Sequence, residues 1–145
     1  MSDEFGVRIK VRGYEVDTQG HLNQAVYLQY AEHARWELLA AAGIRQDELL
    51  STGYGPVVLE THVKYRRELR GGDEVDVGCA FSFDGGKIFQ IRQVFRRMDR
   101  RIAADLTTTA GLLDLTARKL VDDPGAHFRT LAKDPALLGL APDPA

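Results

Sequence analysis

The first patterned segment of the chain alternates hydrophobic with polar positions. Every second residue from Phe5 to Val11 is hydrophobic, and Arg8 and Lys10 fall between them. Successive side chains of a strand point to opposite faces, so this alternation is typical of a strand with one buried face. We therefore predict a strand over residues 5–11, ended by Gly13.

A different spacing begins at Gln24. Hydrophobic residues recur there at intervals of four and three, as on one side of a helix; they are Tyr27, Ala31, Ala34, Leu38 and Ala41. Asn23 suits the N-cap, because its side-chain oxygen accepts a first-turn N–H. Gly43 stands where a left-handed residue commonly ends a helix. The pattern predicts a helix of about nineteen residues, whose alanines would let a sheet approach closely.

From residue 57 the pattern is mostly that of strands, predicted over 57–66, 75–83, 88–95 and 102–115. Residues 57, 59, 61, 63 and 65 are expected to share one face of the first of these strands. A short helix is predicted over 45–52, with Gly53, Gly55 and Pro56 closing the connection that follows it. Another is predicted over 127–133, before a Pro- and Ala-rich tail that we expect to be loose.

The order is therefore one strand, one long helix and four strands in a meander. One apolar helix needs a sheet to bury it, which favours an α+β fold: a five-stranded antiparallel sheet wrapped around one long central helix. We expect a single domain over residues 1–145, with its core at about 5–121. One helix leaves sheet edges and much of one face uncovered, so an oligomer is expected.

Net charge and composition limit the classes of partner and the location that we expect for the protein. The 145 residues carry a net charge of −2, which gives no support to nucleic-acid binding or to an anionic membrane surface. The single cysteine, Cys79, permits no intramolecular disulfide. The charged start MSDEFGVRIK predicts no signal peptide, and no apolar run approaches the ~18 residues of a membrane span. A cytoplasmic location is expected.

The polar turn DTQGHLN between the first strand and the helix is the main candidate for chemistry. Asp17 is either a turn residue or a carboxylate that attacks a carbonyl or activates a water. Gly20 lets the backbone approach a ligand closely, and the helix start near Gln24 supplies N–H groups for an oxyanion. His21 and Asn23 either hydrogen-bond locally or shape a substrate pocket.

Other polar residues have simpler interpretations. Glu32 and Arg35 are three positions apart on the helix and favour a surface ion pair. Glu60 and His62 share a strand face with Lys64 and Arg66, which is either a solvated face or one that lines a site in a neighbouring subunit. The four histidines lack metal-site spacing, and no P-loop, dinucleotide or GxSxG motif is present. No metal and no cofactor is expected.

The chain resembles the hotdog-fold acyl-CoA thioesterases of the 4-hydroxybenzoyl-CoA thioesterase family. The matching residues are those of the turn from Asp17 to Asn23, then Tyr27-Leu28 and Glu32-His33-Ala34-Arg35 on the helix. The later segments Val63-Lys64-Tyr65 and Arg70 to Val75 resemble the family's strand, turn and next strand. The resemblance covers about residues 5–121, and Glu15 departs from the Asp that many members carry there.

The resemblance implies hydrolysis of an acyl-CoA or acyl-carrier-protein thioester to free acid and thiol. It implies that Asp17 is the catalytic carboxylate, as nucleophile or general base, and that an N–H near Gln24 polarises the carbonyl. It implies a homodimer, often paired again, with a pocket formed by His21, Asn23 and Tyr27 and, from the partner chain, by Glu60, Thr61 and His62. CoA phosphates would meet surface cations, for which Lys64, Arg66 and Arg67 are the candidates.

Two alternatives remain open from the sequence. One is a hotdog dehydratase or hydratase acting on β-hydroxyacyl thioesters, which needs a His and an acidic residue facing each other. The other is a non-catalytic protein that binds acyl thioesters on the same fold. The acyl group itself is not indicated by the sequence.

Overall fold

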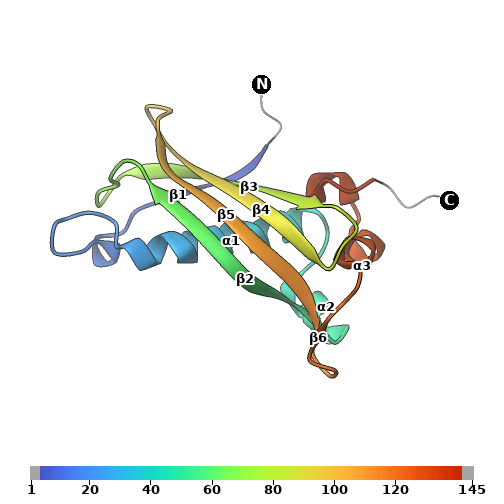
Figure 1. Cartoon of the computed structure of the whole chain (residues 1–145). Helices are drawn as coiled ribbons and strands as arrows, with labels where there is room; N and C mark the ends of the chain where they lie inside the picture. The colour runs from blue at the N-terminus through green and yellow to red at the C-terminus, as the bar shows by residue number, and fades with distance from the viewer. Residues whose placement is uncertain (1–3, 142–145) are drawn as a thin grey trace.

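The computed structural model describes residues 4–141 as a curved antiparallel sheet with a long helix along one face (Figure 1). The strands are β1 (Phe5–Lys10), β2 (Tyr54–Tyr65), β3 (Glu74–Phe83), β4 (Ile88–Arg97), β5 (Ile102–Asp114) and β6 (Lys119–Leu120). The helices are α1 (Gln24–Ala41), α2 (Gln46–Ser51) and α3 (Pro124–Leu131), with short 3-10 turns η1 (Gly13–Glu15) and η2 (Pro135–Leu138).

The order of strands in the sheet is β1-β3-β4-β5-β2, and the two-residue β6 pairs with the end of β5. The predicted meander is therefore wrong at β2, which pairs with β5 rather than with β3. Only β3, β4 and β5 form a meander. Residues 66–73 join β2 to β3 across the end of the sheet. That connection is longer than the two to five residues of a tight hairpin, and this length was the signal in the sequence.

The central helix agrees closely with the prediction. Asn23 caps it by accepting a hydrogen bond from the N–H of Ala25 at 2.9 Å, and the helix runs for 18 residues. Gly43 follows it with φ +94°, a conformation that suits glycine. Ala31 and Ala34 are completely buried in the core that α1 forms against the inner face of the sheet. The small alanines thus allow the close approach that the stripe predicted.

Strand β2 differs from its predicted pattern in two ways. It begins at Tyr54, so Gly55 and Pro56 belong to the strand and do not close the connection before it. Its register with β5 also shifts between Val58 and Glu60, so that one extra residue is accommodated. Such a bulge reverses the alternation of side chains on its two sides. The expected shared face of residues 57 to 65 therefore holds only after the bulge.

The C-terminal segment is packed rather than loose as far as the structure describes it. Phe128 of α3 and Leu138 of η2 are completely buried, and Leu140 is nearly so. The core consequently extends beyond the predicted limit at residue 121. Apolar residues at these positions close the end of the sheet, whereas the Pro and Ala content suggested a free tail. Residues 142–145 of the expected tail lie outside the described part of the chain.

Candidate active site

The site begins where β1 gives way to the turn before α1. Val16 and Leu22 form an isolated antiparallel bridge, and between them the N–H of Asp17 donates to the carbonyl of His21 at 2.7 Å. Gly20 has φ +80° and donates its N–H to the carbonyl of Asp17 at 3.0 Å. The chain therefore closes a tight loop over residues 17–21, and Gly20 provides the left-handed conformation that the loop requires.

The two carboxylate oxygens of Asp17 have different surroundings. Oδ1 accepts hydrogen bonds from the backbone N–H groups of Gln19 at 2.9 Å and His21 at 3.2 Å. Within residues 4–141, Oδ2 accepts none. The side chain is exposed. One oxygen thus holds the turn together, and the other is left for a ligand or water, so the structural and chemical interpretations of Asp17 are compatible.

The connection from β2 to β3 forms the wall opposite this turn. The N–H of Leu22 donates to the carbonyl of Leu69 at 2.7 Å. His21 Nε2 lies 3.2 Å from a carboxylate oxygen of Glu68, which also accepts a hydrogen bond from Arg70 at 2.7 Å. That bond from Arg70, with the charges of Arg70 and His21, lowers the pKa of Glu68 against the opposing effect of desolvation. Glu68 is therefore an ionised neighbour of His21 at neutral pH.

The start of α1 leaves one backbone donor free. The N–H of Ala25 is capped by the side chain of Asn23, and that of Val26 donates to the carbonyl of Asn23 at 2.9 Å. The N–H of Gln24 has no partner among the described residues. First-turn N–H groups and the helix dipole together favour negative charge at this position. The N–H of Gln24 is therefore a hydrogen-bond donor that is still available at this end of α1.

Asp17 and the start of α1 border one hollow of about 480 Å³. It is lined by Asp17, His21, Leu22, Asn23, Gln24, Tyr27, Tyr65, Arg66, Arg67 and Glu68. Tyr27 is 4% exposed and meets Tyr65 edge to face with ring centroids 5.0 Å apart. Burial raises the pKa of Tyr27 to about 12, so its hydroxyl stays protonated. The Tyr65 hydroxyl donates to the carbonyl of Gln24 at 3.1 Å.

The structure does not bring every candidate residue to this hollow. Glu60 and His62, whose side chains lie 2.6 Å apart, and Lys64 lie on the face of β2 away from α1. Thr61 faces inward, with its hydroxyl 3.5 Å from that of Thr108. Within this chain, therefore, none of these four residues reaches the hollow over Asp17.

Sequence reasoning missed three residues of this hollow: Leu22, Tyr65 and Glu68. Glu68 lies in the connection whose path depends on the β2–β5 pairing, so only the correct strand order would have found it. Leu22 and Tyr65 have a local signal. Leu22 is the apolar residue inside the polar turn, and Tyr65 ends the alternation of β2.

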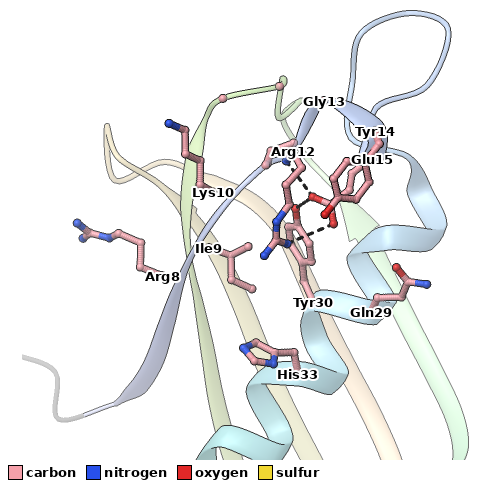
Figure 2. Close-up of a pocket in the computed structure, with 13 residues that line it drawn as sticks. Arg8, Ile9, Lys10, Arg12, Gly13, Tyr14, Glu15, Gln29, Tyr30 and His33 are labelled. Carbon is pink, nitrogen blue, oxygen red and sulfur yellow. Dashed lines mark hydrogen bonds and ion pairs between the residues drawn. The ribbon is translucent and has the colours of Figure 1, made fainter.

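A second hollow, of about 1050 Å³, lies on the other side of the turn, between β1 and α1 (Figure 2). Glu15 lines it beside Arg12 and Tyr30. Its carboxylate accepts hydrogen bonds from the Tyr30 hydroxyl, from the backbone N–H of Arg12 at 2.9 Å and from the Arg12 guanidinium at 3.3 Å. The desolvation of Glu15 is outweighed by these contacts, and the pKa of its carboxyl is lowered. Glu15 thus joins η1 to α1.

Comparison with known proteins places the chain in a family. Residues 11–132 match the model of the thioesterase-like superfamily, so the chain belongs to that family. It is 30% identical to the long-chain acyl-CoA thioesterase FadM of Escherichia coli over 113 residues, which are 77% of this chain and 85% of that protein. It is 39% identical over 82 residues to the chloroplastic acyl-acyl carrier protein thioesterase ATL3 of Arabidopsis thaliana.

The chain spans only 43% of the length of ATL3 and 35% of the related ATL2. Among solved structures, it superposes on YbaW, a probable thioesterase from E. coli, with a TM-score of 0.73 at 27% identity, covering 81% of this chain and 89% of that one. A protein from Aquifex aeolicus gives a TM-score of 0.79 at 24% identity, with 88% and 98% covered. These likenesses confirm the predicted α+β hotdog fold.

Proposed function

We propose that the protein hydrolyses an acyl thioester to a free acid and a thiol. The observation that carries this proposal is that Asp17 and Gln24 line one hollow, and that Oδ2 of the one and the N–H of the other have no partner in residues 4–141. A carboxylate and a free helix N–H are the two groups that hydrolysis of a carbonyl compound needs. Membership of the thioesterase-like superfamily supports the same reaction.

In the general-base route, Asp17 takes a proton from water while the hydroxide oxygen bonds to the thioester carbon. The carbonyl oxygen becomes an oxyanion, which the N–H of Gln24 and the helix dipole stabilise. Collapse of this intermediate breaks the carbon–sulfur bond, and the thiolate leaves and takes up a proton. In the nucleophilic route, Asp17 first forms an anhydride, which water then cleaves. His21 and Asn23 hold the turn in place in both routes.

The thiol that leaves is proposed to be CoA or a carrier-protein thiol. FadM acts on long-chain acyl-CoA and ATL3 on acyl-acyl carrier protein, as their names state. Arg66 and Arg67 line the hollow, and Lys64 stands on the nearby outer face of β2. Arginine and lysine bind phosphate well, so these residues are the proposed contacts for the phosphate groups of CoA or of the carrier protein's thiol-bearing group.

The active assembly is proposed to be a homodimer, with a dimer of dimers as a further step. Strand β2 is an open edge, and its Val58, Leu59 and Tyr65 are about half exposed, as is Leu28 on α1. Exposed apolar side chains next to an unpaired strand edge favour a protein partner. A second copy there would bring Glu60, Thr61 and His62 near a site. No helix within residues 4–141 is long and apolar enough to cross a membrane, and the cytoplasmic location remains a prediction.

A hydratase on unsaturated acyl thioesters is the second candidate, because one observation favours it. His21 Nε2 and Glu68 face each other at 3.2 Å on the same hollow as Asp17. A His and a carboxylate in contact would serve as an acid–base pair for adding water across a double bond. The sequence did not reveal this pair, because Glu68 lies on the connection that crosses the sheet.

One experiment separates these functions. Release of free thiol is measured across a panel of aliphatic and aromatic acyl-CoA esters, and hydration of crotonyl-CoA is measured in parallel, for the wild type and for Asp17→Asn and His21→Asn. The hydrolase proposal expects thiol release that Asp17→Asn abolishes. Hydration of crotonyl-CoA that depends on His21, without thiol release, would establish the hydratase instead. Binding of the esters with neither reaction would indicate a non-catalytic binding protein.

An experiment with isotopically labelled water addresses the choice between the two hydrolytic routes. A single turnover in water labelled with oxygen-18 puts the label directly into the product acid in the general-base route. In the nucleophilic route, water that attacks the Asp17 carbonyl of the anhydride leaves the label in the Asp17 carboxylate, whereas water that attacks the acyl carbonyl labels the product acid. Label in the peptide that contains Asp17, measured by mass spectrometry, therefore establishes the nucleophilic route.

A further inference from the structure

The middle of α1 carries a charged group that faces the core. Arg35 was expected to pair with Glu32 on the surface, but its guanidinium turns inward and donates to the side-chain oxygen of Gln93 at 3.3 Å. Gln93 is completely buried and donates in turn to the carbonyl of Ala31 at 2.8 Å. Within residues 4–141, Arg35 forms no ion pair. Desolvation lowers the pKa of Arg35, and the charge of Glu32 opposes this in part.

A guanidinium that is partly withdrawn from water keeps N–H donors that favour oxygen partners. The half-buried Arg35 uses one of them in a single long hydrogen bond to Gln93. Its other N–H donors have no partner within residues 4–141. Arg35 also lines a cavity, which is where a ligand would meet these donors.

That cavity, of about 90 Å³, lies between α1 and the inner face of the sheet. Its apolar walls include Trp36, Leu39, Phe81, Phe89, Ile91 and Phe128. Among residues 4–141, the half-buried Arg35 and the exposed Glu32 are the charged residues that line it. The cavity therefore combines an apolar lining with one hydrogen-bond donor and one acceptor. At ~30 Å³ for a water-sized group, it has room for roughly three such groups.

The cavity and the candidate active site lie along one stripe of α1. Gln24, Leu28, Glu32 and Arg35 follow one another at spacings of four, four and three, which places them on the same side of the helix. Eleven residues separate Gln24 from Arg35, a distance on the order of 16 Å at ~1.5 Å per residue. Leu28, 44% exposed, gives apolar surface on this side of the helix between the two ends.

We propose, building on the hydrolase function above, that the distal end of a long acyl chain enters this cavity and that Arg35 and Glu32 bind a hydroxyl group there. An extended chain of about a dozen carbons reaches on the order of 14 Å, because its bonds of ~1.5 Å zigzag, and a terminal hydroxyl adds roughly one bond more, which is close to the distance from the N–H of Gln24 to Arg35. A hydroxyl both accepts and donates, so it satisfies Arg35 and Glu32 together. A carboxylate would pair with Arg35 but would meet the like charge of Glu32.

The test compares three esters of equal chain length: dodecanoyl-CoA, 12-hydroxydodecanoyl-CoA and the mono-CoA ester of dodecanedioic acid. The wild type is expected to prefer the hydroxylated ester in kcat/KM by roughly tenfold to a hundredfold, the range for a hydrogen bond to a charged group. Arg35→Met keeps an apolar chain and should lose this preference, so that its kcat/KM values for the hydroxylated ester and dodecanoyl-CoA become about equal. Glu32→Gln should improve hydrolysis of the carboxylated ester.

A binding measurement keeps this proposal separate from the proposed hydrolysis. Equilibrium dialysis of 12-hydroxydodecanoic and dodecanoic acids against the wild type should show the same preference, even if no thioester is cleaved. Arg35→Lys, which keeps the charge, covers the case in which Arg35→Met does not fold, and should retain part of the preference. Equal binding of the two acids by the wild type would overturn the proposal. So would an Arg35 variant that lowers activity on all three esters alike, because that result assigns Arg35 to the core alone.

Discussion

Two carboxylates stand two residues apart in this chain and have opposite surroundings. Glu15 accepts three hydrogen bonds in the larger hollow, beside β1, and its side chain is 11% exposed. Asp17 is exposed in the smaller hollow, and only one of its oxygens is engaged. Glu15 is therefore fixed by more hydrogen bonds than Asp17, and it has fewer free acceptor positions left for a reaction.

The size of the hollow is thus a poor guide to the site. The hollow over Glu15 is about twice as large as the one over Asp17. The Glu15 carboxylate, however, already has the Tyr30 hydroxyl and Arg12 as partners, as Figure 2 shows. At the hollow over Asp17, Oδ2 of Asp17 and the N–H of Gln24 have no partner within residues 4–141. Free hydrogen-bonding capacity distinguishes the two regions better than volume does.

Asp17→Asn should give the largest effect. Asparagine keeps an oxygen that accepts the N–H groups of Gln19 and His21, so the turn should persist, but it removes the base. Turnover is expected to fall by roughly 10²- to 10⁴-fold, the usual contribution of a positioned general base or more. The free energy of unfolding, measured with urea, should stay within ~0.5 kcal/mol of the wild type. Unchanged turnover in a folded variant would contradict the role of Asp17.

Glu15→Ala should have the opposite profile. It leaves the Tyr30 hydroxyl and the N–H of Arg12 without their acceptor in a largely buried place. Loss of such a partner costs about 1–3 kcal/mol, so the free energy of unfolding should fall by that amount. Turnover of the folded fraction should change only a few-fold. A turnover loss as large as that of Asp17→Asn would erase the distinction between the two carboxylates.

The pH dependence of stability sharpens the same comparison. The folded-state pKa of Glu15 lies below its usual 4.5, so its ionisation stabilises the folded protein above pH 4.5. This contribution is lost as the pH falls through the folded-state pKa. Glu15→Gln keeps the shape without titrating. The difference in unfolding free energy between the wild type and Glu15→Gln should therefore be constant above about pH 5 and shrink below 4.5.

This design isolates Glu15 from other acids. Asp76 and Glu68 also have lowered pKa values, because of hydrogen bonds from Arg8 and Arg70, and both also lose ionisation at low pH. They are present in the wild type and in the variant, so their effects cancel in the difference. A difference that stays constant down to pH 3 would show that Glu15 does not contribute through its charge.

Much of this comparison was accessible from the sequence. The turn DTQGHLN, the cap at Asn23 and the stripe of α1 are local patterns, and the structure has them where the pattern placed them. The partner of Glu15 was not accessible. Tyr30 is fifteen residues away, and its hydroxyl reaches Glu15 only because η1 turns the chain back over α1. Glu15 stands where many family members carry Asp. Its hydrogen bond with Tyr30 is visible only in the three-dimensional structure.

The features that sequence missed depend on contacts between distant segments. Strand β2 shows the same alternation whether it pairs with β3 or with β5, so its place at the edge was not evident, nor was the position of Glu68 opposite His21. The inward turn of Arg35 was missed for a similar reason. Spacing of three on a helix indicates that Glu32 and Arg35 are neighbours, but the burial of Gln93 beneath them decides where Arg35 points.

The smallest predicted effect compares a tyrosine from each side of the turn. Tyr65→Phe removes the hydrogen bond to the carbonyl of Gln24 from a half-exposed side chain, and water can replace it. The expected cost is about 0.5 kcal/mol of unfolding free energy. Tyr30→Phe removes the bond to Glu15 from a side chain that is 3% exposed, and leaves a carboxylate with one partner fewer.

Tyr30→Phe should therefore cost more than Tyr65→Phe, by about 1 kcal/mol, because a hydrogen bond to a charged group contributes more than one to a neutral carbonyl. Urea denaturation of the two variants side by side measures this difference, and each removes only one hydroxyl oxygen. Equal costs would mean that Glu15 is as well solvated as the start of α1. The contrast between a saturated and an available carboxylate would then have to rest on the catalytic data for Asp17 alone.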